Sequence, residues 1–210
     1  MKLYGYFRSS AAYRVRIALN LKGLAAEYAP VHLVRGEQRQ AGFLAKNPQG
    51  LVPVLELDDG SLLTQSLAII EYLDALQPEP RLIPTDALLA AKVRAIALAI
   101  ACDIHPLNNL RVLDYLKNEL HHGREDVGAW VRHWLLKGGL DSIEHMIESA
   151  PFCFGASPTL ADVCLIPQIF NARRFAAPLE HLPKIKAVEA ACAELPAFRA
   201  AHPSQHSDAE

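Results

Sequence analysis

The sequence contains no apolar run that approaches the roughly 20 residues needed to span a bilayer. It also lacks a strong charge imbalance, because 21 basic and 23 acidic side chains give a formal net charge of -2, and no long run of Lys and Arg occurs. These absences argue against a membrane protein and against a nucleic-acid-binding protein. The N-terminus shows strand-like alternation instead of a basic flank and an apolar signal core, so we expect a cytoplasmic protein.

Cysteine is also scarce, and no C-x-x-C pair is present. The four cysteines are widely spaced, and three of them lie in segments with helical character: the set is Cys102, Cys153, Cys164 and Cys192. This distribution predicts small buried thiols and argues against a disulfide framework or a metal site.

What is present is a chain of two compositional halves, divided by the Pro-rich stretch "LQPEPRLIPTDA". Hydrophobic residues make up 51% of the 210 positions, which is enough for a sizeable core. Strands and helices alternate before the stretch, and almost everything after it has helical periodicity. We therefore predict an α/β domain over residues 1–78, a linker over 79–86 and an all-helical domain over 87–210.

The first half predicts the order β-α-β-α-β-β-α. A strand at "KLYGYF" precedes a helix, and "AEYAPVHLV" predicts a second strand that Pro30 confines to an edge. A short helix is expected over residues 40–45. The segment "VPVLELDDGSLL" predicts a hairpin that turns at Gly60, and "QSLAIIEYLDAL" predicts the last helix of this half.

The second half predicts helices, beginning with a stripe of apolar residues from Leu89 to Ile100. Further helices are expected near residues 105–120, 126–149, 159–175 and 184–195. The segment Thr159-Leu160-Ala161-Asp162 has the form of a capping box at the start of one of them. We interpret this box as a folding signal and not as part of a reactive site.

Two serines stand where the first strand should turn into the first helix, in "RSSAAYRVRIAL". The start of a helix exposes unpaired N–H groups and a partial positive charge, which stabilise an anion such as a thiolate or carboxylate. Alternatively, Ser9 or Ser10 simply caps the helix, a position in which serine is common.

Two later segments carry similar ambiguity. Pro53 opens a strand in "NPQGLVPVLEL", where the Val52–Pro53 bond is either an ordinary trans bond or a cis bond that turns the Val52 backbone outward. Gln65 and Ser66 stand at the start of the helix after the hairpin, where Ser66 either caps that helix or binds a carboxylate.

Taken in order, five segments resemble the zeta class of the glutathione transferases. They are "YFRSSAAYRVRIAL", "NPQGLVPVL", "QSLAIIEYL", "IHPLNNLRVL" and "PTLADVCLIPQIFNARRF". The resemblance extends from Lys2 to about His202, and members of this class are maleylacetoacetate and maleylpyruvate isomerases. It implies a thioredoxin-like N-terminal domain followed by a helical domain that completes the substrate site, in a homodimer with glutathione as cofactor.

The resemblance also implies roles for individual residues. Ser9 would bind the glutathione sulfur together with Ser10 and the following backbone. Val52 would pair with the cysteinyl backbone, and Gln65 and Ser66 with the γ-glutamyl carboxylate. The remaining glutathione contacts implied for this chain are Ala11, Arg14, Gln38, Pro53, His105, Asn109, Leu110 and Arg111. Ala11 occupies the position where the class motif usually has Cys, so that Cys cannot be essential here.

The activity implied is cis–trans isomerisation of a maleyl keto acid, a dicarboxylate, by reversible addition of a thiolate to the double bond. Cations are then needed near the substrate carboxylates and the developing enolate. Arg8 lies beside the thiolate serine and is a catalytic candidate together with Ser9 and Ser10. Arg173 and Arg174 point about 100° apart on their helix, and the class pattern favours Arg174 for the substrate.

Two other functions remain open on the sequence. A glutathione transferase can conjugate small electrophiles, although arginines suit an apolar electrophile pocket poorly. The same fold can also serve as a non-catalytic interaction module, although Ser9, Pro53, Gln65 and Ser66 are all retained. The motifs do not determine which maleyl keto acid is the substrate, and "IHPLNNLRVL" leans the interpretation towards maleylpyruvate and a bacterial enzyme.

Overall fold

The computed structural model describes residues 1–209, which divide into two compact units. The first unit contains Met1–Leu82 together with the segment from Ala193 onward, and the second contains Ile83–Cys192. The expected boundary near residues 79–86 agrees with this division. The expectation that residues 87–210 form one helical domain does not, because the C-terminal segment packs with the N-terminal unit.

The first unit is built on a four-stranded sheet with the strand order β2-β1-β3-β4. Strand β1 (Lys2–Gly5) pairs in parallel with β2 (Glu27–Pro30) and antiparallel with β3 (Val54–Glu56). Strand β4 (Leu62–Thr64) completes the sheet in a hairpin with β3. Thus β2 is an edge strand, as Pro30 predicted, because an edge tolerates a residue without an N–H donor.

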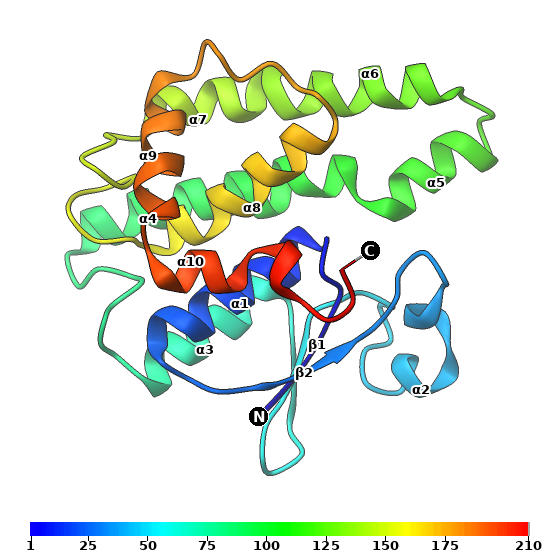
Figure 1. The fold of residues 1–210 in the computed structure, drawn as a ribbon, viewed down its shortest axis with the longest axis horizontal. Coiled ribbons are helices and arrows are strands. Elements are labelled where there is room, and N and C mark those ends of the chain that lie inside the picture. Colours follow the sequence, from blue (N-terminus) through cyan, green and yellow to red (C-terminus); the bar gives the residue numbers. More distant parts are fainter. Residues whose placement is uncertain (210) are drawn as a thin grey trace. The chain divides into compact units, whose positions relative to one another are not determined.

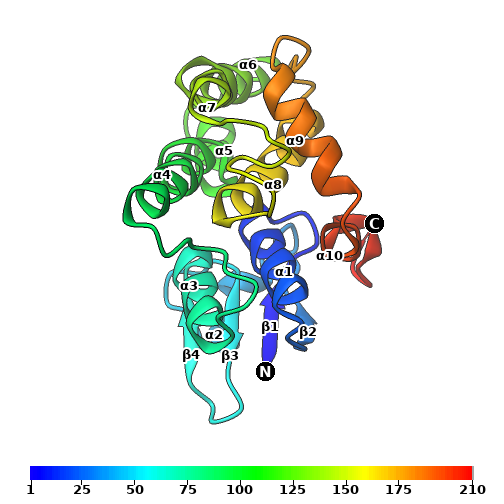
Figure 2. The ribbon, with the colours of Figure 1, turned by 90° about the vertical axis from the view of Figure 1, so that its left-hand side faces the viewer.

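The helices of this unit follow the predicted order. Helix α1 (Ser10–Lys22) and α3 (Ser66–Leu76) lie side by side and pack together (Figure 2). The short helix α2 (Ala41–Leu44) contributes Phe43 to a buried cluster. Its other members follow β1 or β2, or lie in or shortly before β3: Tyr6, Phe7, Val31, Val52 and Val54. The β1–α1 turn is therefore embedded in the core.

The C-terminal segment adds a helix that the sequence pattern did not predict. Helix α10 (Pro196–Ala201) packs along α1, and the chain then returns towards the junction of β1 and α1 (Figure 1). Asn20 of α1 donates to the Ala197 carbonyl at 2.9 Å, and Arg16 donates from Nε to the Ala201 carbonyl at 3.1 Å. These hydrogen bonds, together with the packing of α10 along α1 and the burial of Phe198, attach this segment to the first unit.

The second unit is helical throughout most of its length. Its α-helices in chain order are α4 (Ala87–Leu98), α5 (Leu110–Asn118), α6 (Arg124–Leu135), α7 (Asp141–Met146), α8 (Leu160–Arg174) and α9 (Pro183–Ala193). Helix α4 packs against α8 and continues into a π-helical turn, Ala99–Ile104, and a 3-10 turn, His105–Asn108. No helix within residues 1–209 is both long enough and apolar enough to cross a membrane.

The prediction of a single helix near residues 126–149 is wrong. The backbone leaves the helical region at Lys137, Gly138 and Gly139, and Gly138 has a φ of +71°. This left-handed conformation suits glycine, which lacks the Cβ that penalises it in other residues. The glycine pair therefore divides the segment into α6 and α7.

The cysteine prediction is confirmed for three residues and wrong for one. Cys153, Cys164 and Cys192 are buried, whereas Cys102 is exposed, and all four are free thiols. Burial raises the pKa of the Cys153 and Cys192 thiols well above the usual range, so both stay protonated at neutral pH.

The capping box at Thr159 is confirmed. Thr159 Oγ1 accepts from the Ala161 N–H at 3.3 Å, and Asp162 Oδ2 accepts from the Thr159 N–H at 2.8 Å. Asp162 is fully buried, and its Oδ1 accepts from the Cys153 N–H at 2.8 Å. The box thus joins the start of α8 to the loop that precedes it.

Thr159→Ala is expected to lower the free energy of unfolding by about 1 kcal/mol, because the first turn of α8 loses a side-chain acceptor. For a chain of this size the corresponding fall in Tm is roughly 2–4 °C, measurable by differential scanning calorimetry. Ser157→Ala, at an exposed position in the same loop, is the matched control. Equal Tm values for the two variants would contradict a stabilising role of the cap.

Candidate functional site

The turn between β1 and α1 presents Arg8 and Ser9 at the start of a helix. Ser9 is the N-cap of α1, and its Oγ accepts from the Ala12 N–H at 3.2 Å. Its hydroxyl hydrogen remains able to donate, since the cap uses only the oxygen. Ser10 is buried inside the first turn, so of the two serines it is Ser9 and not Ser10 that caps the helix.

Arg8 is held over two aromatic rings. Its Nη2 donates to the Tyr6 hydroxyl at 2.8 Å, and its Cζ lies 5.5 Å from the Tyr6 ring centroid and 5.1 Å from that of Phe7. A guanidinium stacked in this way keeps its charge and several donors while losing freedom of movement. Arg8 is therefore a half-buried, oriented cation one residue before Ser9.

The Val52–Pro53 peptide bond is cis, so the trans alternative is wrong. The β3 ladder begins only at Val54, which places the Val52 peptide just before the paired part of the strand. Val52 packs in the same buried cluster as Tyr6 and Phe7, and it therefore lies close to the β1–α1 turn.

Gln65 and Ser66 stand at the start of α3 in an unusual backbone conformation. Gln65 has a φ of +65°, which a residue with a Cβ rarely adopts, and such strain is typical of ligand-binding positions. Gln65 is the N-cap residue but makes no side-chain capping bond, so the interpretation of Ser66 as the cap is wrong. Gln65 Nε2 instead donates to Gln49 Oε1 at 2.9 Å.

Arg14 and Ser66 connect α1 with α3. Arg14 is only 1% exposed, and its Nη1 donates to the Ser66 hydroxyl at 3.2 Å. A charge-assisted bond of this kind orients the hydroxyl that it contacts. Arg14 is thus a buried neighbour of the start of α3 and not a solvated side chain.

Gln38 and Ala11 complete the residues of the first unit that the sequence singled out. Gln38 is 6% exposed, and its buried Oε1 has no hydrogen-bond partner within residues 1–209. A buried amide oxygen without a donor is costly, which is what a ligand-binding position shows when its ligand is absent. Ala11 lies half-buried in the first turn of α1.

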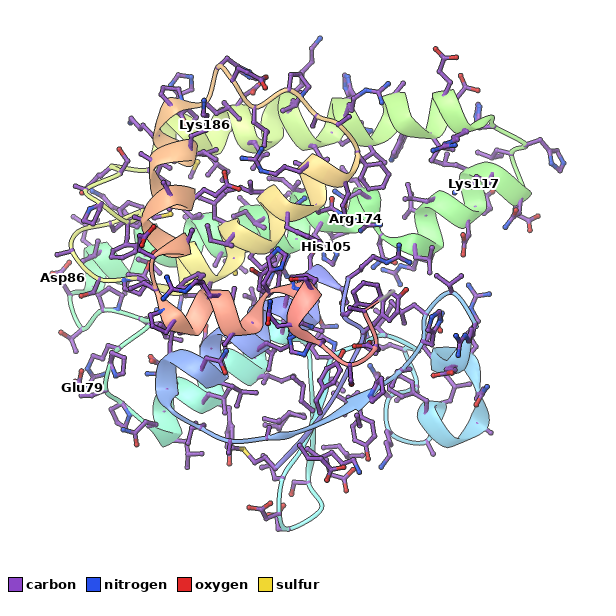
Figure 3. The ribbon with its side chains drawn as sticks, viewed as in Figure 1. Glu79, Asp86, His105, Lys117, Arg174 and Lys186 are labelled. Carbon is purple, nitrogen blue, oxygen red and sulfur yellow. The ribbon has the colours of Figure 1, made fainter. Side chains whose placement is uncertain are left out.

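The candidates of the second unit cluster at the start of α5. Asn109 caps this helix, and its Oδ1 accepts from the Arg111 N–H at 3.1 Å. Leu110 is the first residue of α5, Arg111 is exposed, and His105 opens the preceding 3-10 turn (Figure 3).

Asn108, which the sequence analysis did not single out, is buried in this turn. Both of its amide atoms have no hydrogen-bond partner within the described chain. The sequence signal was the Asn-Asn pair itself, but only the structure distinguishes the helix cap from the buried neighbour.

The two arginines at the end of α8 differ in their surroundings. Arg173 Nε donates to Glu189 Oε1 at 2.9 Å, so its charge is paired with α9. Arg174 is the last residue of α8, and its Cζ lies 5.8 Å from the Phe175 ring centroid (Figure 3). The ion pair of Arg173 with Glu189 agrees with its interpretation as a surface charge, and Arg174 stays a prediction.

Comparison with known proteins bears on both units. The family model described as glutathione S-transferase, N-terminal domain, matches residues 3–81. A maleylacetoacetate isomerase of Pseudomonas aeruginosa is 49% identical over 99% of this chain and 98% of its own length. A holo structure of a maleyl pyruvate isomerase, described as a bacterial glutathione S-transferase in the zeta class, is 45% identical with a TM-score of 0.96 and covers 100% of both chains.

A further solved structure carries molecules in its active site. It is a maleylacetoacetate isomerase from Anaeromyxobacter dehalogenans 2CP-1 with bound dicarboxyethyl glutathione and citrate. It is 43% identical to this chain, has a TM-score of 0.89, and the match covers 100% of this chain and 97% of that one.

Proposed function

Because the chain belongs to the zeta class of the glutathione transferases, we propose that it is a glutathione-dependent cis–trans isomerase of a maleyl keto acid. The observation that carries this proposal is the placement of Arg8 and Ser9 at the start of α1 in a chain nearly half identical to a maleylacetoacetate isomerase. We also propose a homodimer and a cytoplasmic location, both on the family resemblance.

Several residues of the first unit fit glutathione. Gln38 has a buried amide oxygen that lacks a donor, and Gln65 has the strained backbone of a ligand contact. Ser66 lies at the start of α3, where N–H groups favour a carboxylate, and Val52 presents a peptide outside the β3 ladder. We assign these residues to glutathione together with Ser9, Ser10, Ala11, Arg14, Pro53, His105, Asn109, Leu110 and Arg111.

When bound, glutathione supplies a thiolate that can add reversibly to the alkene and allow rotation about the former double bond. Ser9 donates a hydrogen bond to the sulfur, and the first N–H groups of α1 add a positive potential. Lowering a thiol pKa by about two units requires roughly 2.7 kcal/mol of thiolate stabilisation, which these two contributions can supply together.

Arg8 holds a substrate carboxylate and stabilises the charge that develops on the neighbouring carbonyl. Its orientation by Tyr6 and Phe7 means that little reorganisation is needed when this charge appears. Arg174 is the second substrate cation in this proposal. The dicarboxyethyl glutathione bound by the relative supports the proposed addition of the thiolate to the double bond, because that molecule has the connectivity of a thiol added across a butenedioate.

The choice between maleylpyruvate and maleylacetoacetate is a matter for kinetics, since relatives bear both names. The two substrates differ in the length of the tail beyond the ketone. Measuring kcat/KM for both with the same preparation would identify the better substrate, and we propose maleylpyruvate.

Activity is expected to require glutathione without consuming it. Dialysed protein should not isomerise the maleyl keto acid, and added glutathione should restore turnover, because Ala11 stands where the class motif usually has Cys and carries no thiol that could replace glutathione. The measurement combines product absorbance with a thiol titration after many turnovers.

A stoichiometric loss of thiol in this assay would contradict the isomerase and support conjugation of electrophiles. Failure to retain the protein on immobilised glutathione, together with no turnover, would support the non-catalytic interaction module instead.

A further inference from the structure

Phe7, the residue before Arg8, forms hydrogen bonds through both of its backbone polar groups. The Phe7 carbonyl accepts from Arg16 Nη2 at 2.9 Å, and the Phe7 N–H donates to Asp208 Oδ2 at 3.0 Å. Strand β1 ends at Gly5, so neither group takes part in the sheet. These two bonds determine the orientation of the peptides on both sides of Phe7.

Arg16 connects the Phe7 backbone to the C-terminal segment. Its guanidinium is buried and also donates to the Tyr6 carbonyl at 3.4 Å and to the Ala201 carbonyl at 3.1 Å. The Tyr6 carbonyl in turn accepts from the Ser9 N–H at 2.9 Å. The backbone that carries Arg8 and Ser9 is therefore fastened to a side chain of α1 that itself contacts the end of α10.

Asp208, which accepts the hydrogen bond from the Phe7 N–H, lies in the C-terminal tail, which we define as residues 202–209. The tail lies against the start of α1 (Figure 1), and Asp208 Oδ2 also accepts from the Tyr28 hydroxyl of β2 at 3.2 Å. A carboxylate makes stronger bonds to N–H donors than a neutral acceptor does. Its Oδ1 is buried without a hydrogen-bond partner in the described residues, so this placement has a desolvation cost.

We infer that Asp208 is a positioning residue for Arg8 and Ser9. By fixing the Phe7 amide it sets the direction in which the chain leaves β1, and hence where the Arg8 guanidinium reaches Tyr6. The inference rests on the proposed function, in which Arg8 and Ser9 act on substrate and thiol. Misplacing a catalytic group by about 1 Å can cost on the order of 100-fold in rate, so a tail residue with no substrate contact matters to turnover.

The first test needs neither glutathione nor substrate. Hydrogen–deuterium exchange of the peptide that spans Phe7 to Ser9 should be faster in Asp208→Ala than in the parent protein, because the Phe7 N–H loses its acceptor. Asp208→Asn keeps an amide oxygen and should show intermediate exchange. Ser207→Ala, at the exposed neighbouring position, is the matched control and should exchange like the parent.

The second test is kinetic. Asp208→Ala should lower kcat/KM for the maleyl keto acid about tenfold and raise the pKa of bound glutathione, measured by thiolate absorbance, while Asp208→Asn recovers most of both. Tyr28→Phe removes the other donor to the same oxygen but leaves the Phe7 bond, so it should retain nearly the parent values.

Three outcomes would overturn the inference. Unchanged exchange at Phe7 in Asp208→Ala would show that the bond does not fix the turn, and unchanged kcat/KM would show that the turn does not need it. Equal losses in Asp208→Ala and Tyr28→Phe would mean that Asp208 only fastens the tail. If Asp208→Ala does not fold, Asp208→Asn is compared with the parent protein and Tyr28→Phe in its place. A parent protein without isomerase activity would refute the proposed function, and the exchange test would still decide whether Asp208 fixes the turn.

Discussion

Replacing Arg8 by methionine is expected to lower kcat/KM for the maleyl keto acid by roughly one to two orders of magnitude, while glutathione affinity stays nearly intact. One charge-assisted hydrogen bond at a desolvated site contributes about 1.5 to 3 kcal/mol, which corresponds to this range. Glutathione affinity should persist because its carboxylates are assigned to Gln38, Gln65 and Ser66. The measurements are steady-state kinetics and calorimetric titration with glutathione.

Arg8→Lys should recover only part of the loss, since an ammonium keeps the charge but lacks the planar fork that stacks on Tyr6 and Phe7. Arg81→Met is a control, because Arg81 is an exposed arginine of the same unit that forms an ion pair with Glu79 at 3.5 Å. An equal fall of glutathione affinity and dicarboxylate turnover in Arg8→Met would place Arg8 at the cofactor instead.

The element order of the first unit could be predicted because its signals are local. Period-two alternation marked β1, Pro30 marked the edge strand, and Gly60 marked the β3–β4 turn, where its φ is +84°. Each of these signals depends on the conformational limits of one residue or on the pattern within a few neighbours. For this reason the order of the elements could be predicted without knowledge of any long-range contact, and the structure confirms it.

The parts of the fold that escaped prediction depend on contacts between distant residues or on a backbone choice within an otherwise helical pattern. Arg16 and Ala201 are 185 positions apart in the chain, and Phe7 and Asp208 are 201 positions apart. No local pattern therefore indicates that the C-terminal segment joins the first unit. The break at Gly138 interrupts apolar periodicity that continues on both sides, and glycine alone does not end a helix.

The candidate site shows the same division. The motif order identified Ser9, Val52–Pro53 and Gln65–Ser66. It could not decide which serine caps its helix, or whether the Val52–Pro53 bond is cis or trans. The cis bond, the positive φ of Gln65 and the capping role of Ser9 all depend on backbone angles that neighbouring elements impose. Arg14 could not be identified as buried, because its partner Ser66 lies 52 positions away.

Because Ser9 is also the N-cap of α1, its substitution has two separable consequences. Ser9→Ala removes the acceptor for the Ala12 N–H, which should cost about 1 kcal/mol of stability, whereas Ser9→Gly should cost only a few tenths. Both variants lose the hydroxyl proposed to donate to the glutathione sulfur. A comparison of the two therefore separates the stability of the helix from the stabilisation of the thiolate.

Both Ser9→Ala and Ser9→Gly are expected to lower kcat by about one order of magnitude or more and to raise the pKa of bound glutathione, since a hydrogen bond to a charged group contributes about 1.5 to 3 kcal/mol. The pKa would be measured from thiolate absorbance across pH, and the stability from thermal unfolding. Ser10→Ala should change kcat far less, because Ser10 lies inside the first turn and Ser9 supplies the cap. If kcat fell in Ser9→Ala but not in Ser9→Gly, the cap and not the hydroxyl–sulfur bond would be responsible; equal losses in Ser9→Ala and Ser10→Ala would show that the thiolate depends on the helix start as a whole.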